Sequence, residues 1–448
     1  MTRISASRAL ARCLGLVLLL VAAAVQGSEA ELRYDRDYPV VGYSTAPTAN
    51  AIARLQSRLD RGELQLRFDP VRGYLDSILQ ALSIDPASQT LVYSKTSLQI
   101  GGISAATPRA IYFNDDTYVA WVQGDRLLEI AAVDSALGAV FYTLPNRPVA
   151  TVRFARETSR CLNCHDTFFM SGGGVPRFVF TSGVTGSNGD PLTSEGSSQV
   201  TDRTPLEHRW GGWYVTGQQG SQTHLGNILA RTAADFAHDD PARRVNRNSL
   251  ADLFDTSPYL SDKSDIVALL VMEHQGYVQN LITRLNFKAR SALAREAPAT
   301  PAPRTWAGLP PSLQKKFRPM AESVVRAMMF IDEAAINDGI RGSSGFDAWF
   351  RAQGPRDHDG RSLRELDLNS RLFRYPVSYL VYSAAFEGMP EYAQDYILRR
   401  MADILSGRDT VAPSSQVTAA DRRAGLEILA ATKPAFARVV ADRGQDSP

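Results

Sequence analysis

The sequence is poor in cysteine, and this scarcity limits how the fold can be stabilised. Its 448 residues include three cysteines, of which Cys161 and Cys164 stand almost together and Cys13 lies near the N-terminus. A small disulfide-rich fold needs cysteine pairs that join distant segments, so this class is excluded. The fold must be held by a hydrophobic core, for which a chain of this length with 44% hydrophobic residues is sufficient.

An excess of charge of one sign is also missing. Lysine and arginine number 49 against 47 aspartate and glutamate residues, which gives a formal charge of +2. Nucleic-acid binding normally requires a basic surface, so we expect no nucleic-acid partner. Long apolar runs are scarce as well, and the run at residues 13–25 is the longest and purest.

That run belongs to a predicted signal peptide at residues 1–27. Three arginines and no acidic residue precede it, and small residues follow it. It is too short for a comfortable membrane span, although an uncleaved N-terminal anchor is the alternative. Cleavage would change the formal charge from +2 to −1. We therefore expect a nearly neutral periplasmic or secreted protein with no membrane span after cleavage.

The two remaining cysteines lie in the sequence Cys161-Leu162-Asn163-Cys164-His165, which is the C-x-x-C-H pattern of covalent haem attachment. This spacing lets both sulfurs reach the two vinyl groups of one porphyrin. The adjacent histidine then lies beneath the iron and can supply a nitrogen ligand. The pattern predicts one covalent haem c, attached through Cys161 and Cys164 and ligated by His165.

Three other interpretations of the motif stay open. A thioredoxin-like redox pair also uses C-x-x-C, and a predicted strand at 149–154 gives it some support. A zinc site would need further ligands, and the adjacent Cys164 and His165 share one metal badly. A plain disulfide between Cys161 and Cys164 is the third.

The motif in an exported chain resembles that of c-type cytochromes. By this resemblance Cys161 and Cys164 carry the thioethers and His165 the proximal iron bond. The chain is also similar to large single-haem exported bacterial proteins without an established activity. The segments that carry this second likeness are RWGGWYVTG at 209–217, MEHQ at 272–275 and YPVSYLVYS at 375–383. The resemblance implies haem and export and leaves the reaction open.

The sixth iron position has two histidine candidates besides His165. His274 falls within the apolar stripe of a predicted helix at 264–286, where it is either a core histidine held by hydrogen bonds, an axial ligand or a base near the iron. His224 follows a glycine-rich turn that permits close approach to a flat ring. Met170 stands too close to His165 along the chain to reach the opposite face of the ring easily.

The remaining histidines are weaker candidates. His208 has less support than His224. His238 and His358 stand in acidic, polar surroundings that are typical of solvated surface loops.

The order of predicted elements favours an α+β fold. Strands expected at 109–114, 118–122, 127–133 and 139–144 form an antiparallel meander, with helices before them at 49–59 and 74–84. A loop-rich haem segment follows, and the C-terminal half is helical, with helices at 264–286, 313–336, 389–405 and 419–431. These changes divide the chain into a signal peptide (1–27), a mixed N-terminal region (28–150), a haem-binding region (151–296), a linker (297–312) and a helical region (313–448).

Two functions fit these observations. In the first, the haem is closed by His274, His224 or a methionine and passes electrons to a periplasmic redox partner. In the second, the chain is a haem-dependent oxidoreductase of peroxidase-like or oxidase-like chemistry, with an open distal side where such a histidine, with Arg284, assists proton transfer. The length favours an enzyme, whereas the single redox centre favours a carrier. We expect electron transfer, with the oxidoreductase as the alternative.

Overall fold

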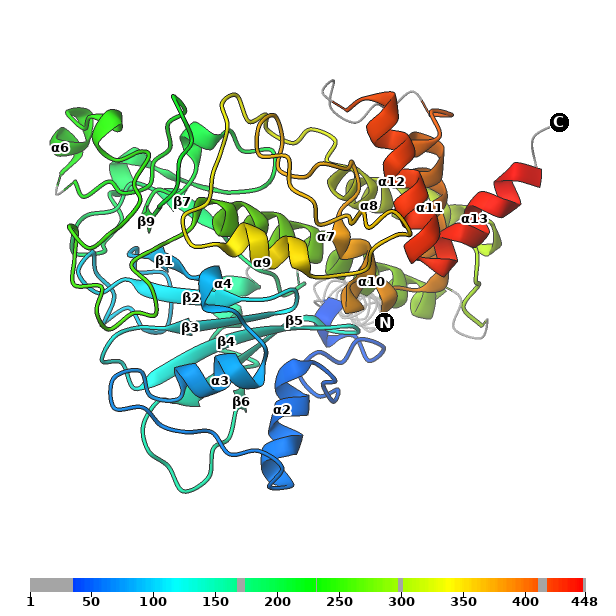
Figure 1. Cartoon of the computed structure of the whole chain (residues 1–448). Helices are drawn as coiled ribbons and strands as arrows, with labels where there is room; N and C mark the ends of the chain where they lie inside the picture. The colour runs from blue at the N-terminus through cyan, green and yellow to red at the C-terminus, as the bar shows by residue number, and fades with distance from the viewer. Residues whose placement is uncertain (1–34, 167–173, 231, 297–300, 410–416, 446–448) are drawn as a thin grey trace, which may run out of the picture.

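The computed structural model describes residues 35–166, 174–230, 232–296, 301–409 and 417–445. It confirms the α+β class, with a seven-stranded antiparallel sheet packed among helices (Figure 1). The strands follow the order β6-β5-β4-β3-β2-β1-β9, and β7 and β8 form a separate hairpin. Their bounds are β1 Thr90–Val92, β2 Arg109–Phe113, β3 Thr117–Trp121, β4 Leu127–Asp134, β5 Gly138–Pro145, β6 Ala155–Arg156, β7 Thr181–Gly183, β8 Ser197–Gln199 and β9 Trp213–Tyr214.

The predicted meander is confirmed as β2 to β5. Each strand pairs antiparallel with the next, as in the register Ile111↔Ala120 between β2 and β3. The turn from β4 to β5 is held by Asp134, whose carboxylate accepts hydrogen bonds from the backbone N–H groups of Ala136 and Leu137 at 3.0 and 3.2 Å. Such an acidic turn residue satisfies donors that the sheet leaves unpaired.

Side chains alternate between two covered faces of the sheet. Tyr142 of β5 points to the face that α2 covers, where its hydroxyl accepts a hydrogen bond from the Asn50 amide at 3.0 Å. Its neighbour Phe141 points to the opposite face, which is crossed by α7. Because both faces are covered, β3 is buried at every residue. We call the side that carries Phe141 the α7 face.

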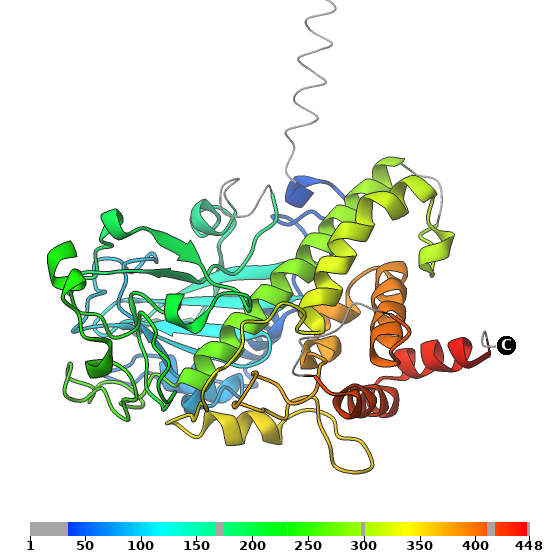
Figure 2. The same cartoon turned by 90° about the horizontal axis from the view of Figure 1, so that it is seen from above.

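Helix α7 (Ile266–Glu296) dominates the middle of the molecule and crosses it diagonally, with α8 beside it (Figure 2). It begins at Asp265, whose carboxylate accepts hydrogen bonds from the backbone N–H groups of Val267 and Ala268. Most of its N-terminal half is buried because the sheet and other helices surround it. The helix extends beyond the predicted 264–286.

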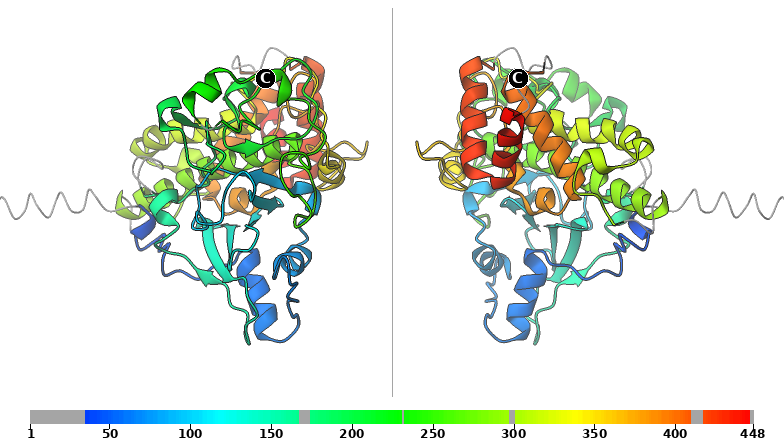
Figure 3. Two further views of the ribbon diagram at one scale, coloured as in Figure 1. Left: turned by 90° about the vertical axis from the view of Figure 1, so that its left-hand side faces the viewer. Right: turned by 90° about the vertical axis from the view of Figure 1, so that its right-hand side faces the viewer.

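The other helices lie at both ends of this framework. Their bounds are α2 Ala51–Asp60, α3 Leu75–Ala81, α4 Leu162–His165, α6 Ala233–Ala237, α8 Pro311–Met328, α9 Phe346–Ala352, α10 Ala384–Glu387, α11 Glu391–Leu405, α12 Ala419–Thr432 and α13 Pro434–Gln445. Helices α11 to α13 pack together at one end of the molecule. The right-hand view of Figure 3 looks onto this end, with α12 and α13 nearest the viewer.

Two helix boundaries differ from the sequence prediction for local reasons. Helix α8 ends at Met328 instead of residue 336, because Phe330 and Asp332 adopt positive φ angles of 53° and 70° that a right-handed helix cannot contain. Pro434 lies three residues beyond the end of the last predicted helix, at 419–431. It begins α13, where its missing N–H is no loss because the first turn of a helix leaves that group unpaired.

The predicted regions share one core instead of packing as separate units. Strands β6 and β9 come from the region 151–296 and join the sheet formed by the N-terminal region. No strand forms at the predicted 149–154. The two-residue strand β6 begins directly after it. In the expected linker, Trp306 is buried against Tyr396, with ring centroids 4.3 Å apart. The predicted signal peptide lies outside the described residues, and none of the described helices is long and apolar enough to span a membrane.

Gly276 sets how closely the segment 178–180 approaches α7. An added Cβ there would lie 2.2 Å from Cε2 of Phe180. We expect Gly276→Ala to destabilise the fold by about 1–3 kcal/mol through overpacking, despite the helix propensity of about 1 kcal/mol that alanine adds. Urea unfolding measures the effect.

The matched control is Gly425→Ala in α12. Its Cβ would meet its nearest neighbour at 3.4 Å, an ordinary contact. This variant should be neutral or stabilised by up to about 1 kcal/mol. Equal effects of the two substitutions would contradict the close approach at Gly276.

Candidate functional site

A cavity of about 580 Å³ lies between the α7 face of the sheet, helix α7 and the segment that carries the cysteines. Its volume falls within the range of about 300–1,000 Å³ that is typical of cofactor pockets. Most of its lining is apolar or aromatic, as in Val92, Ile111, Ala120, Phe141, Phe178, Phe180, Trp213 and Met272. We call this space the sheet cavity.

All three residues of the predicted attachment motif line the sheet cavity. Cys161 caps the single helical turn α4, and Cys164 and His165 lie on that turn. Leu162 points into the core and is 4% exposed, which fixes the orientation of the turn. Both cysteines are free thiols. The structure therefore gathers Cys161, Cys164 and His165 at one wall of a cavity of cofactor size.

Residue 177 forms two hydrogen bonds with His165, one with its ring and one with its backbone. Its Nδ1 lies 2.7 Å from the Arg177 carbonyl oxygen, and the Arg177 N–H donates to the His165 carbonyl at 3.0 Å. A carbonyl can only accept, so Nδ1 carries the proton and Nε2 keeps its lone pair. Metal-binding histidines are usually oriented in this way. Burial also lowers the pKa of His165, which keeps the ring neutral.

The surroundings of Cys161 disfavour thiolate chemistry. Burial raises the pKa of this thiol to about 12, and the charges of Glu129 and Glu157 act in the same direction. Redox-active and zinc-binding cysteines need the opposite, because the thiolate is the reactive and ligating form. The thioredoxin-like and zinc interpretations therefore receive no support from this environment.

One charged pair inside the sheet cavity has an atom without a hydrogen bond on each side chain, although the other Glu129 oxygen, Oε1, accepts from the Leu98 N–H at 3.0 Å. Arg109 Nε and Glu129 Oε2 lie 3.5 Å apart, and both atoms are buried without a hydrogen-bond partner in the described part of the chain. Unpaired buried polar atoms are rare in folded proteins and suggest a missing polar partner. At the rim, Leu98 and Ile100 are 39% and 53% exposed. A large apolar ligand with polar groups would satisfy both features.

Met272 is the functional candidate that the sequence analysis missed. It lies on α7, is fully buried and lines the sheet cavity. Its Sδ is 3.8 Å from the Thr90 hydroxyl of β1. Helical periodicity marked the whole stretch as buried but could not say which of its residues faces a cavity. The sequence MEHQ at 272–275 contains both possible ligands, and the prediction named His274 and not Met272.

His274 is a core histidine, which was one of the interpretations left open. Its Nδ1 is 2.8 Å from the Asp202 carboxylate and its Nε2 is 2.8 Å from the Ser378 hydroxyl, so neither nitrogen is free for iron. It also does not line the sheet cavity. These three residues have the order of a nucleophilic triad, but Ser378 is completely buried and a substrate cannot reach its hydroxyl.

His224 is likewise not placed as an iron ligand. It is 1% exposed, packs edge-on against Trp210 at 5.4 Å and accepts a hydrogen bond from the Gly226 N–H through Nδ1. It is absent from the lining of the sheet cavity, so the expectation of iron ligation has no geometric basis. Gly226, two residues further along the chain, lies against the ring of His224 itself.

The other candidate iron ligands lie on the surface, except for one that is outside the described residues. His238 and His358 are exposed, as predicted, and His208 is exposed beside Glu207. His358 stands near Asp357 and Asp359 in an acidic group of metal-ligand spacing. Asp357 is already paired with Arg361 at 2.7 Å, so this group is adequately explained as a surface ion network. Met170 lies outside the described residues.

Comparisons of the chain with protein-family models, with curated proteins and with solved structures find no match. The C-x-x-C-H motif and the geometry around it are therefore the features that indicate a function.

The neutral, buried His224 predicts a loss of stability in acid. Burial lowers its folded-state pKa to about 3 from 6.5, so the unfolded chain gains the proton first as the pH falls. Its contribution is present above pH 6.5 and is lost below it, by about 2 kcal/mol between pH 6.5 and 4.5. His224→Asn keeps an acceptor for Gly226 and should flatten this part of the stability curve. Chemical unfolding across pH measures it.

His208→Asn is the control because this side chain is exposed. Its stability curve should keep the slope of the native protein. A slope that His224→Asn leaves unchanged would show that the histidine is protonated in the fold.

Proposed function

We propose that this protein binds one covalent haem c in the sheet cavity and acts as a periplasmic electron-transfer protein. The single observation that carries the proposal is the coincidence of the C-x-x-C-H motif with a large, mainly apolar cavity. The two features are independent, since the motif is read from five residues and most of the cavity lining comes from the sheet and from the segments 95–100 and 178–181. Export through the predicted signal peptide supports the location, and a periplasmic redox protein is the expected partner.

The residues of the cavity suit such a group. Cys161 and Cys164 would hold it by thioether bonds, and His165 would bind its iron through Nε2. Bound haem would supply a one-electron redox centre. The apolar walls lower the local dielectric, and the unsatisfied atoms of Arg109 and Glu129 offer polar contacts. The exposed Leu98 and Ile100 would cover an apolar edge.

Met272 is the candidate for the sixth ligand. Methionine and histidine are the usual pair of axial ligands in electron-transfer cytochromes c, and the thioether raises the reduction potential. Met272 lines the cavity, whereas His274 and His224 do not. If Met272 held the iron, its thioether would close the site to small molecules, which would favour electron transfer over catalysis.

The alternative is a haem-dependent oxidoreductase with an open distal side. Arg284, His274 and His224 were its expected distal residues, and none of them lines the sheet cavity. Arg109 and Glu129 are the charged groups that would take this role, because they share the cavity and have unsatisfied atoms. The state of the sixth position separates the two functions.

The attachment is tested by replacing both cysteines. Protein purified from a host that matures c-type cytochromes should show a haem band on a denaturing gel and keep its haem through acid and organic extraction. Cys161→Ala with Cys164→Ala should remove that resistance, because no thioether can form. A native protein that carries no haem at all, or a double variant that retains it through extraction, would contradict the proposal.

The sixth ligand is tested by optical spectra with and without carbon monoxide. The native ferrous protein should be low-spin and indifferent to carbon monoxide, and Met272→Ala should become high-spin and bind it. Met328→Ala is the control, since Met328 is equally buried but lies on α8 outside the cavity. A native protein that already binds carbon monoxide would favour the oxidoreductase.

A further inference from the structure

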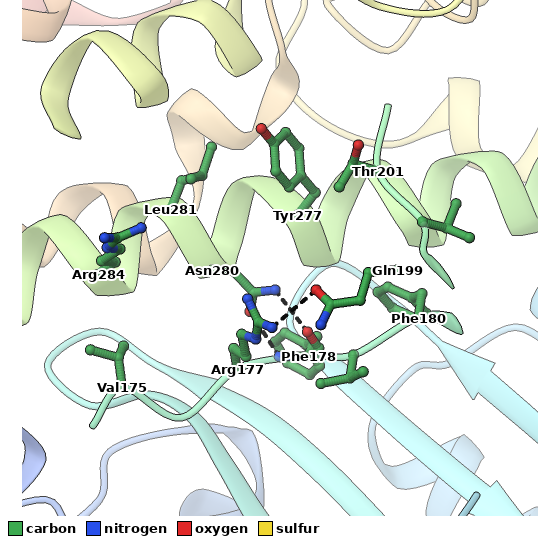
Figure 4. A pocket seen from close by; sticks show the side chains of 12 residues that line it. Val175, Arg177, Phe178, Phe180, Gln199, Thr201, Tyr277, Asn280, Leu281 and Arg284 are labelled. Atoms are coloured by element: carbon green, nitrogen blue, oxygen red, sulfur yellow. Dashed lines mark hydrogen bonds between the residues drawn. The ribbon is translucent and has the colours of Figure 1, made fainter. Parts of the chain in front are cut away.

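A second, smaller cavity of about 100 Å³ lies between α7 and the chain around the β7–β8 hairpin (Figure 4). Phe178, Val179 and Phe180 line both this cavity and the sheet cavity, so they form a shared wall. Arg177 enters the lining from one side and Arg284 of α7 from the other. We call this space the arginine pocket.

The arginine pocket contains two positive charges and no acidic side chain in its lining. Within the described residues neither Arg177 nor Arg284 forms an ion pair. The sequence 167–173, which lies outside the described residues, contains no acidic residue. Two uncompensated guanidinium groups in one small cavity repel each other, and an anion would relieve that repulsion.

A third cavity contains clustered arginines that are neutralised by carboxylates. It is lined by Arg243, Arg244 and Arg247. Each of these pairs with its own aspartate, Asp240, Asp239 and Asp252 respectively. The arginine pocket departs from this pattern, because its two guanidinium groups have no carboxylate between them.

One polar atom of Arg177 has no hydrogen-bond partner within the described residues, which indicates that a ligand is missing. Its Nη2 donates to the Gln199 side chain at 3.0 Å, while its Nε is buried without a hydrogen-bond partner. Burial and the charge of Arg284 lower the pKa of Arg177. The Asn280 amide accepts a hydrogen bond from the Phe178 N–H at 2.7 Å and donates one to the Phe178 carbonyl at 2.8 Å, which fixes the wall of the pocket against α7.

We propose that the arginine pocket binds a small oxyanion through Arg177 and Arg284. A planar guanidinium donates two parallel hydrogen bonds to a carboxylate or phosphate group, which explains the choice of arginine over lysine. The cavity of about 100 Å³ has room for an anion of only a few heavy atoms. The oxyanion is either a free small anion or a carboxylate that a bound haem extends into the pocket.

The pocket is linked to the iron-ligand candidate through the backbone of one residue. The side chain of Arg177 lines the arginine pocket, and its carbonyl oxygen accepts the hydrogen bond from His165 Nδ1. An anion that fixes Arg177 therefore also fixes the acceptor that orients His165. Binding of a free anion does not depend on haem, whereas a haem carboxylate as the ligand rests on the proposed function.

The test is isothermal titration calorimetry with inorganic phosphate and acetate in chloride-free buffer of low ionic strength. Both the native protein and the Cys161→Ala, Cys164→Ala variant are titrated. Saturable binding should weaken about tenfold or more in Arg177→Gln and in Arg284→Gln, since each loses a charge-assisted hydrogen bond. Arg284 is exposed, so its replacement should leave the fold intact.

Arg304→Gln is the control because it removes one exposed positive charge that is not part of the pocket lining. It should bind both anions as the native protein does. Binding to both proteins supports a free anion as the ligand, and binding to the cysteine variant alone supports a haem carboxylate. Absence of saturable binding in both proteins, or equal weakening by all three arginine substitutions, would overturn the proposal. If the native protein carries no haem, the same titrations still test the anion site. Failure of the haem proposal can therefore be told apart from failure of the anion proposal.

Discussion

The packing of α7 against the sheet is the constraint on which the site depends. Gln275 and Gln279 of the helix are hydrogen-bonded to the buried Tyr118 hydroxyl of β3, at 2.7 and 3.1 Å. Their amides also donate to the backbone carbonyls of residues 114 and 115. These directional contacts fix the height of the helix above the sheet, because a buried amide without partners would be costly. The space that the apolar side chains leave beneath the helix is the sheet cavity.

The same helix also positions the chain that closes the cavity. Asn280 of α7 binds the backbone of Phe178 in both directions, and Gly276 lets Phe180 lie directly against the helix. Residue 177 then holds His165. A series of contacts thus connects the sheet, through α7 and residues 177–180, to the single helical turn that carries the two cysteines. One turn has little stability of its own, so its geometry is set by what it packs against.

Much of the fold was predictable because it follows local patterns. The strands β2 to β5 alternate and are separated by Asp and Gly turns, and they formed where expected within one or two residues. The errors were of a different kind. The end of α8 depended on positive φ angles at Phe330 and Asp332, and the role of Pro434 depended on a helix that begins there. The regions on either side of residue 150 are joined by the packing of α7 on the sheet and by β6 and β9, and these two strands are only two residues long and leave almost no periodic signal.

The sequence by itself determined the C-x-x-C-H pattern, because the spacing of Cys161, Cys164 and His165 is a local property of five adjacent residues. It also determined that the stretch around His274 is a buried helix, since apolar periodicity is local too. Only the tertiary structure decided which residues of that helix face a cavity. Met272 lines it, while His274 is enclosed between Asp202 and Ser378. The physical reason is that a helix surrounded by partners buries every side, and long-range contacts alone distinguish one buried side from another.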